Sequence, residues 1–162
     1  MEKMTQRTNT SAGIMEIMIL VGVPQSYRLP ESNEDNLLQI GRLLYRRDLG
    51  KVIAFRSDSA STACAENVIK KASSLEMSFT PMQELSKGYF LDSVAHELIM
   101  REAEAQLART VIVVADQDFC LELAAYTAMK IKRKDIVVQL PLLHRGRSVL
   151  VDFTKGKVER SW

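Results

Sequence analysis

Two acidic side chains follow the most apolar run of the sequence. Residues 111–114 are four consecutive β-branched residues, a pattern typical of a strand buried on both faces of a sheet. Asp116 and Asp118 come directly after this run, and a helix-like segment over 119–132 follows them. Because open α/β sheets usually bind ligands at the ends of such strands, both carboxylates are candidate binding residues. Either of them could instead cap the following helix.

The histidines and cysteines form no recognisable catalytic or metal-binding motif. His96 falls inside a predicted helix, where we expect it at the surface or its boundary, and His144 lies in a short basic turn. Cys64 and Cys120 fall in helix-like segments and are expected to be small buried residues. No glycine-rich phosphate loop or nucleophile elbow follows a strand. We therefore expect neither a metal site nor a bound cofactor.

Composition and charge narrow the class of protein. The chain has 162 residues, of which 46% are hydrophobic and 26% charged, with a formal net charge of +2. These values predict one globular domain over residues 14–162, preceded by a flexible polar tail over 1–13. The net charge is too small to indicate nucleic acid, and the basic run at 130–134 is expected to be a solvated helix end. With neither a signal peptide nor a membrane-spanning segment, we expect a cytoplasmic protein without a membrane partner.

Apolar runs alternate with amphipathic stretches along the chain. The predicted strands cover 14–23, 51–56, 77–82, 111–114, 135–140, 148–153 and 157–162. The predicted helices cover 34–49, 62–75, 92–108 and 119–132. This alternation predicts an α/β three-layer sandwich, in which helices flank a mainly parallel sheet. The pattern leaves the order of the strands open.

Five segments carry a likeness to a known family. They are ILVGVPQS at 19–26, FRSDSASTACAE at 55–66, MQELSKG at 82–88, VIVVADQDF at 111–119 and the apolar ending at 140–162. In order and hydrophobic pattern, the chain resembles the histidine phosphatase superfamily, close to the short phosphohistidine phosphatases. The resemblance covers nearly the whole chain and implies the phosphoglycerate-mutase-like fold. It depends on order and pattern more than on any strict motif.

The chain departs from this family at the catalytic positions. The family's phosphate pocket uses an Arg-His pair at the end of the first strand, where this sequence has Gly22 and Val23. The family's second arginine falls near residues 58–60, none of which is basic, and its second histidine falls at Asp116. Only the family's acid is kept, at Glu84. The resemblance therefore implies a member that is degenerate at its catalytic positions.

These departures decide which chemistry is possible. In-line phosphoryl transfer needs a nucleophile and cations that spread the charge of the transferring group. Val23 cannot attack phosphorus, and Asp116 would place a negative charge where the phosphate should bind. Arg28, Arg56 and Arg147 could lean toward the pocket, but none of them replaces the nucleophile.

We therefore expect a catalytically inactive histidine-phosphatase-like domain that acts as a binding, regulatory or assembly module. Its expected binding site is a cleft lined by Gln25, Ser57, Glu84, Asp116 and Asp118. Because it keeps several carboxylates and lacks the family's arginines, this cleft should prefer a cation or an uncharged polar group to a phosphate. The partner, an unknown small polar ligand or a protein, and the oligomeric state stay open.

Two alternatives remain at this point. An active enzyme of the same fold could use Glu84 and Asp116 as paired carboxylates for acid/base work. A flavodoxin-like binding domain is the other alternative, and a sheet without an antiparallel edge would favour it.

Overall fold

The computed structural model describes residues 15–23, 31–46, 48–74, 78–85, 92–140 and 148–160. The predicted tail over 1–13 lies outside the described residues, and so do Gln25, Arg28, His144 and Arg147. The remaining candidate residues are described.

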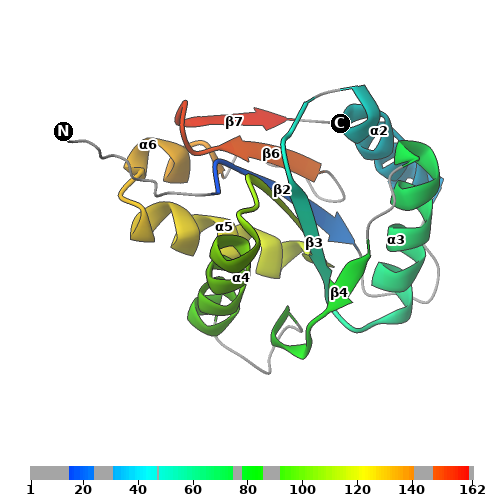
Figure 1. Ribbon diagram of the computed structural model, residues 1–162, viewed down its shortest axis with the longest axis horizontal. Coiled ribbons are helices and arrows are strands. Elements are labelled where there is room, and N and C mark those ends of the chain that lie inside the picture. Colours follow the sequence, from blue (N-terminus) through cyan, green and yellow to red (C-terminus); the bar gives the residue numbers. More distant parts are fainter. Residues whose placement is uncertain are drawn as a thin grey trace.

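One six-stranded sheet organises the fold, with the strand order β4-β3-β5-β2-β6-β7 (Figure 1). Its strands are β2 (Ile17–Val23), β3 (Val52–Arg56), β4 (Phe79–Pro81), β5 (Thr110–Asp116), β6 (Ser148–Asp152) and β7 (Lys157–Arg160). Strands β2, β3, β4 and β5 run parallel, whereas β6 pairs antiparallel with β2 and β7 pairs antiparallel with β6. The predicted α/β sandwich with a mainly parallel sheet is thus confirmed. The antiparallel edge argues against the flavodoxin-like alternative.

Strands β2 and β5 form the centre of the sheet because their side chains are apolar on both faces. They pair in parallel from Ile17 opposite Thr110 to Val23 opposite Asp116. Every residue of β2 is buried, and so is every residue of β5 except the last. A strand covered on both faces needs this continuous run rather than an alternating one.

Helices cover both faces of the sheet (Figure 1). Helices α2 (Glu31–Arg46) and α3 (Ala60–Ser73) pack on one face through a cluster that includes Leu37, Ile40 and Ile69. The other face is covered by α4 (Asp92–Gln106), α5 (Gln117–Lys130) and the short α6 (Lys134–Val137). None of the described helices has the length and apolar content needed to cross a bilayer.

Helices α2 and α3 approach closely at a glycine. A Cβ atom at Gly41 would come within 2.3 Å of the Ala72 Cβ atom. The absence of a side chain at Gly41 therefore allows the two helices to pack closely.

The strand predicted at 135–140 is wrong, because this segment forms α6 followed by turns. Ile136 and Leu140 are both buried in the core, whereas Val138 between them is 74% exposed. Burial of residues four apart is the helical pattern, and it outweighs the β-branched composition that suggested a strand. The other predicted strands and helices form, with ends displaced by a few residues.

Candidate functional site

The carboxyl ends of the parallel strands bring most of the predicted site residues to one edge of the sheet. Val23 ends β2 opposite Asp116, which ends β5. Arg56 ends β3 opposite Val114 of β5, and the next residue, Ser57, donates its N–H to the Val114 carbonyl at 2.9 Å. Ser57 is buried. Adjacent strands thus place these positions side by side at the edge where α/β sheets bind ligands.

Asp116 has a structural role at this edge. It is the N-cap of α5, and its Oδ1 accepts a hydrogen bond from the backbone N–H of Asp118 at 3.0 Å. Asp116 is half-buried, whereas Asp118 is exposed in the first turn of the helix. The capping interpretation of Asp116 is therefore confirmed, and a carboxylate here also interacts favourably with the helix dipole.

Glu84 reaches the same edge from β4. The Met82 N–H after β4 donates to the Arg56 carbonyl at 2.8 Å, and this bond holds the start of the 3₁₀ helix η1 (Gln83–Leu85) beside the end of β3. Leu85 is fully buried and anchors η1, while Glu84 is half-buried. Glu84 thus follows the strand next to the one that leads to Ser57.

Arg56 is held by a carboxylate that the sequence did not suggest. Its Nε lies 2.7 Å from Oε1 of Glu66 on α3, and both side chains are only about 15% exposed. Arg56 Nη1 also donates to the Ser57 carbonyl at 3.2 Å. The other oxygen of Glu66 accepts from the Phe79 N–H at 3.4 Å and lies 3.7 Å from Lys70 Nζ. Ten residues separate Arg56 from Glu66, across a strand end and a helix start, so no local spacing rule reveals the pair.

Hydroxyl groups occupy the start of α3, near the position of the family's second arginine. Ser59 is the N-cap, and it forms a capping box with Thr62: the Ser59 Oγ accepts from the Thr62 N–H, while the Thr62 Oγ1 accepts from the Ser59 N–H. The Thr62 hydroxyl also donates to the Ser57 carbonyl. These bonds satisfy the helix start without a basic side chain.

The end of β2 is apolar. Val23 is 3% exposed and belongs to the core cluster that includes Leu37 and Ile40 of α2. Gly22 precedes it and pairs with Ala115 of β5. The positions at which the family resemblance would place an arginine and a histidine therefore contribute to packing.

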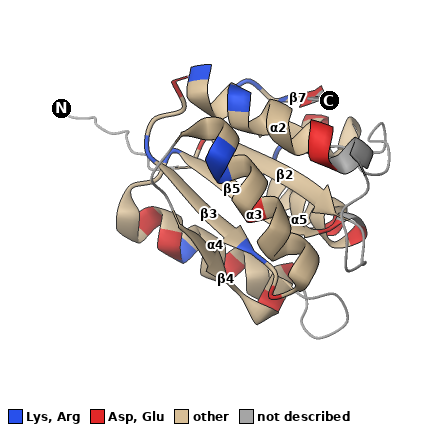
Figure 2. Ribbon diagram, turned by 90° about the vertical axis from the view of Figure 1, so that its right-hand side faces the viewer, with Lys and Arg blue, Asp and Glu red and all other residues tan. Residues whose placement is uncertain are grey.

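Acidic residues surround this edge of the sheet, and basic residues mark the opposite ends of the helices. Figure 2 shows this for α2, which is red near its start and blue near its end. The last turns of α2, α3 and α5 carry Arg46, Lys70 with Lys71, and Lys130, respectively. The described acidic residues at or near the carboxyl edge include Glu34, Asp35, Asp58, Glu66, Glu84, Asp92, Asp116 and Asp118. The arginine at this edge, Arg56, is paired with Glu66.

The two cysteines differ in environment. Cys120 lies below the edge, and its Sγ donates to the Val21 and Ala115 carbonyls at 3.7 Å each. Burial raises the pKa of the Cys120 thiol to about 12, and the nearby Asp116 carboxylate adds to that rise. This thiol is therefore unreactive near neutral pH, as its expected packing role requires. Cys64 is exposed on α3, so its predicted burial was wrong.

The expectation that His96 lies at the surface or its boundary was also wrong. The ring is 6% exposed between α4 and α5, with Nδ1 at 2.9 Å from the Thr127 Oγ1 and the ring 5.2 Å from that of Tyr126. Burial lowers the pKa of His96 below its ordinary value, and the positive charge of Lys130 acts in the same direction against Glu97. Helical periodicity gave no signal for this, because α4 is only weakly amphipathic.

In the described part of the chain, no three His, Cys, Asp or Glu side chains converge closely enough to hold a metal ion.

Comparison with known proteins links this arrangement to solved structures. No family model matches the chain, and no curated protein matches its sequence. The fold is similar to that of a candidate phosphohistidine phosphatase, SixA, from Agrobacterium tumefaciens, with a TM-score of 0.62 and 13% identity over 85% of this chain and 92% of that chain.

Two further structures share the fold. Phosphoglycerate mutase from Plasmodium falciparum gives a TM-score of 0.57 and 15% identity, covering 89% of this chain and 87% of that chain. A candidate alpha-ribazole-5′-P phosphatase from Escherichia coli gives a TM-score of 0.55 and 10% identity, covering 90% of this chain and 94% of that chain. The chain therefore has the phosphoglycerate-mutase-like fold that these structures share.

Proposed function

We propose that this protein is a non-catalytic relative of the histidine phosphatases, in which the fold serves binding, regulation or assembly. The observation that carries the proposal is the pairing of Val23 with Asp116 at the carboxyl edge. The family resemblance places a nucleophilic histidine at the first position and a phosphate-binding histidine at the second. A buried valine and a helix-capping carboxylate occupy them instead.

Phosphoryl transfer is disfavoured at this edge for two physical reasons. The hydrocarbon side chain of Val23 has no lone pair with which to attack phosphorus. The Asp116 carboxylate repels a phosphate dianion, at a cost on the order of a few kcal/mol for partly buried charges. Arg56 cannot offset this charge while it is paired with Glu66. The catalytic effect that a ring of cations provides in phosphoryl transfer is thus missing from the described residues of the edge.

The same chemistry supports a different kind of ligand. Ser57, Glu84, Asp116 and Asp118 follow three neighbouring strands, and we propose that they form a binding site together with Gln25. Carboxylates and a serine suit a cation or an uncharged polar group, whereas a phosphate would lack a counter-charge. A small polar molecule or a polar segment of another protein fits this description.

Hydrolysis of a panel of phosphomonoesters and phosphohistidine tests the proposal, with and without magnesium. The matched control is the double variant Glu84→Gln and Asp116→Asn, which removes both charges and leaves an amide that can still cap α5. We expect the two proteins to show the same background hydrolysis. Turnover by the unmodified protein that is lost in the double variant would overturn the proposal, and it would establish an enzyme that uses these carboxylates as acid and base.

A further inference from the structure

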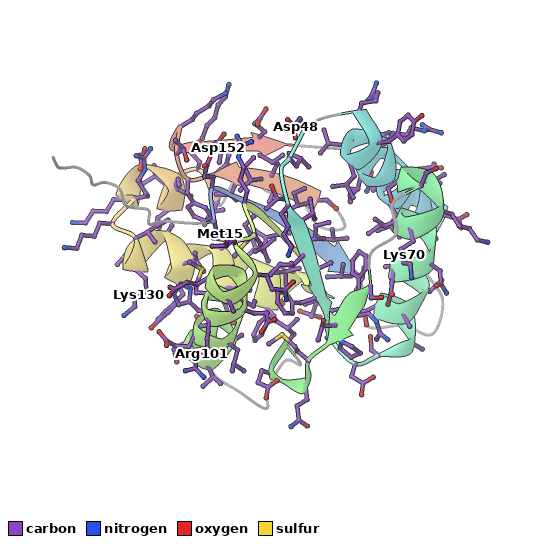
Figure 3. The ribbon with its side chains drawn as sticks, viewed as in Figure 1. Met15, Asp48, Lys70, Arg101, Lys130 and Asp152 are labelled. Atoms are coloured by element: carbon purple, nitrogen blue, oxygen red, sulfur yellow. The ribbon has the colours of Figure 1, made fainter. Side chains whose placement is uncertain are left out.

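A second charged surface lies away from the candidate site, where α5 turns into α6. We call it the basic corner and define it by Met129, Lys130, Ile131, Lys132, Lys134, Val138 and Lys155. Lys130 ends α5, and Lys134 begins α6 two residues after Lys132. All of these side chains are exposed. Figure 3 shows Lys130 on the outer side of α5.

The fold brings a distant basic residue to this corner. The turn between β6 and β7 packs beside α6 (Figure 1): a Cβ atom at Gly156 would meet the Arg133 and Asp135 side chains within 2.2 Å. The side-chain amide of Gln139 also donates to the Gly156 carbonyl at 3.0 Å and accepts from the Val158 N–H at 2.9 Å. Lys155, which precedes this glycine, therefore extends the charge of the α5–α6 turn.

The lysines of the basic corner keep their charge unneutralised. Arg133 pairs with Asp135 at 3.1 Å, so these two charges cancel. Lys130, Lys132, Lys134 and Lys155 form no ion pair with any residue that the structure describes. Four free ammonium groups on neighbouring turns attract an anionic surface.

Exposed apolar side chains accompany this charge. Val138 is 74% exposed, Met129 56% and Ile131 37%. These three belong to the few large hydrophobic side chains of the described chain that are exposed to this degree. The sequence predicted a solvated helix end here. Polar side chains would suit such a helix end better than these apolar ones.

Folding alone does not explain the lysines. Lys132 adopts a left-handed backbone with a φ of 61°, where glycine or asparagine is usual. Lys134 is at the start of α6, where the helix dipole favours an acidic residue. The charges of Lys130, in the last turn of α5, and of Lys132, directly after its C-cap, are the ones that helix stability favours.

We propose that the basic corner docks on a membrane surface that contains anionic lipids. Lysines reach toward lipid headgroups while adjacent apolar side chains enter the interface, and this combination is typical of peripheral membrane contacts. Protein interfaces are depleted of lysine and enriched in aromatic residues and arginine. None of the residues that define the corner is aromatic or an arginine, and the neighbouring Arg133 is paired with Asp135.

This proposal revises the expectation that the protein has no membrane partner. The net charge of +2 conceals the corner, because acidic residues at the carboxyl edge offset its lysines. The contact is peripheral, and it stands whether or not the candidate site is catalytic.

Co-sedimentation with lipid vesicles tests the proposal on the full chain. We expect binding to vesicles of phosphatidylcholine with phosphatidylserine, weak binding to phosphatidylcholine alone, and loss of binding as salt is added. The double variant Lys130→Gln and Lys132→Gln should lower the partition coefficient about twenty-five-fold, since each lysine near an anionic surface contributes about fivefold. The double variant Met129→Ser and Val138→Ser should weaken binding to the same vesicles while leaving the salt dependence in place.

A matched control removes two charges from the opposite side of the sheet. Arg42→Gln on α2 and Lys71→Gln on α3 change exposed side chains and lower the net charge by the same amount. This variant should bind within about twofold of the unmodified protein. Equal loss in the control and the corner variant would overturn the proposal, and so would equal binding to both kinds of vesicle. Absence of vesicle binding would also overturn the proposal. If the protein bound polyglutamate but no vesicles, the corner would instead have an acidic protein partner.

Discussion

The two ends of the parallel strands are built differently. At the amino end, backbone bonds join three strands: Glu16 and Ile17 both donate to the Arg109 carbonyl, and Arg109 donates to the Lys51 carbonyl. The buried Thr110 hydroxyl adds a 2.6 Å bond to the Leu49 carbonyl. At the carboxyl end, backbone bonds also run from Ser57 to the Val114 carbonyl and from Met82 to the Arg56 carbonyl, but the described strands then lead into helix caps and acidic side chains.

This difference distinguishes the part of the sheet that stabilises the fold from the part that carries the candidate site. The buried centre of the sheet and its amino end bind the strands together, so side chains at the carboxyl end can change without loss of the architecture. This explains how a chain with 10% to 15% identity to the structures it resembles keeps their fold while its carboxyl edge has an acidic character. Strand β5 allows a direct test, because a residue can be substituted at its centre (Ile112), at its amino end (Thr110) and at its carboxyl end (Asp116).

The largest effect is expected at the centre of β5. Ile112 is fully buried and packs in the cluster beneath α2 and α3. Ile112→Ala should lower the free energy of unfolding by about 2–5 kcal/mol, because it leaves a cavity in a close-packed core. Urea denaturation followed by circular dichroism measures this. A loss below about 1 kcal/mol would contradict the view that the centre of the sheet holds the fold.

A smaller effect is expected at the amino end of the same strand. Thr110→Val keeps the shape of the side chain but removes the donor to the Leu49 carbonyl. We expect a loss of about 1–3 kcal/mol in the free energy of unfolding, since a buried carbonyl is left without its partner. Thr110→Ser is the control, and it should recover most of the stability measured by urea denaturation.

The smallest loss of stability along β5 is expected at its carboxyl end. Asp116→Ala removes the N-cap of α5 and should cost about 1 kcal/mol in the free energy of unfolding. Asp116→Asn should cost only a few tenths, because asparagine caps a helix nearly as well. If both variants lost as much stability as Ile112→Ala, the two ends of the strand would not differ in the proposed way.

The smallest effect near neutral pH concerns His96 in the helical layer, away from both strand ends. Burial lowers its pKa below 6.5, so the unfolded chain takes up the proton at a higher pH than the native protein does. Its contribution to stability is complete above about pH 6.5 and is lost as the pH falls from there toward the lowered native pKa.

Thermal unfolding as a function of pH measures this contribution. In His96→Asn, the side-chain amide can replace the Nδ1 bond to Thr127 but does not titrate. The melting temperature of this variant should fall less than that of the unmodified protein as the pH is lowered from 7 to about 5. Parallel curves would show that His96 does not contribute to the pH dependence.

Local sequence patterns predicted the strands and long helices because burial on both faces leaves a continuous apolar run. They failed at 135–140, where β-branched composition concealed the spacing of Ile136 and Leu140. Patterns also placed Ser57, Glu84, Asp116 and Asp118 after strands, and their use as a binding site stays a prediction. The Arg56–Glu66 pair and the buried His96 depend on how separate elements pack, which one sequence does not specify.

The most direct test of the central claim is a search for a phosphoenzyme. The protein would be incubated with phosphoramidate, a small phosphoryl donor, and its intact mass measured before and after mild acid, which releases phosphate from histidine. We predict no acid-labile phosphoryl adduct at the carboxyl ends of β2, β3 or β5, because Val23 occupies the nucleophile's position and Asp116 faces it. An acid-labile adduct that maps to a residue at the carboxyl ends of β2, β3 or β5 would contradict the account, since it would show that this edge still transfers phosphate.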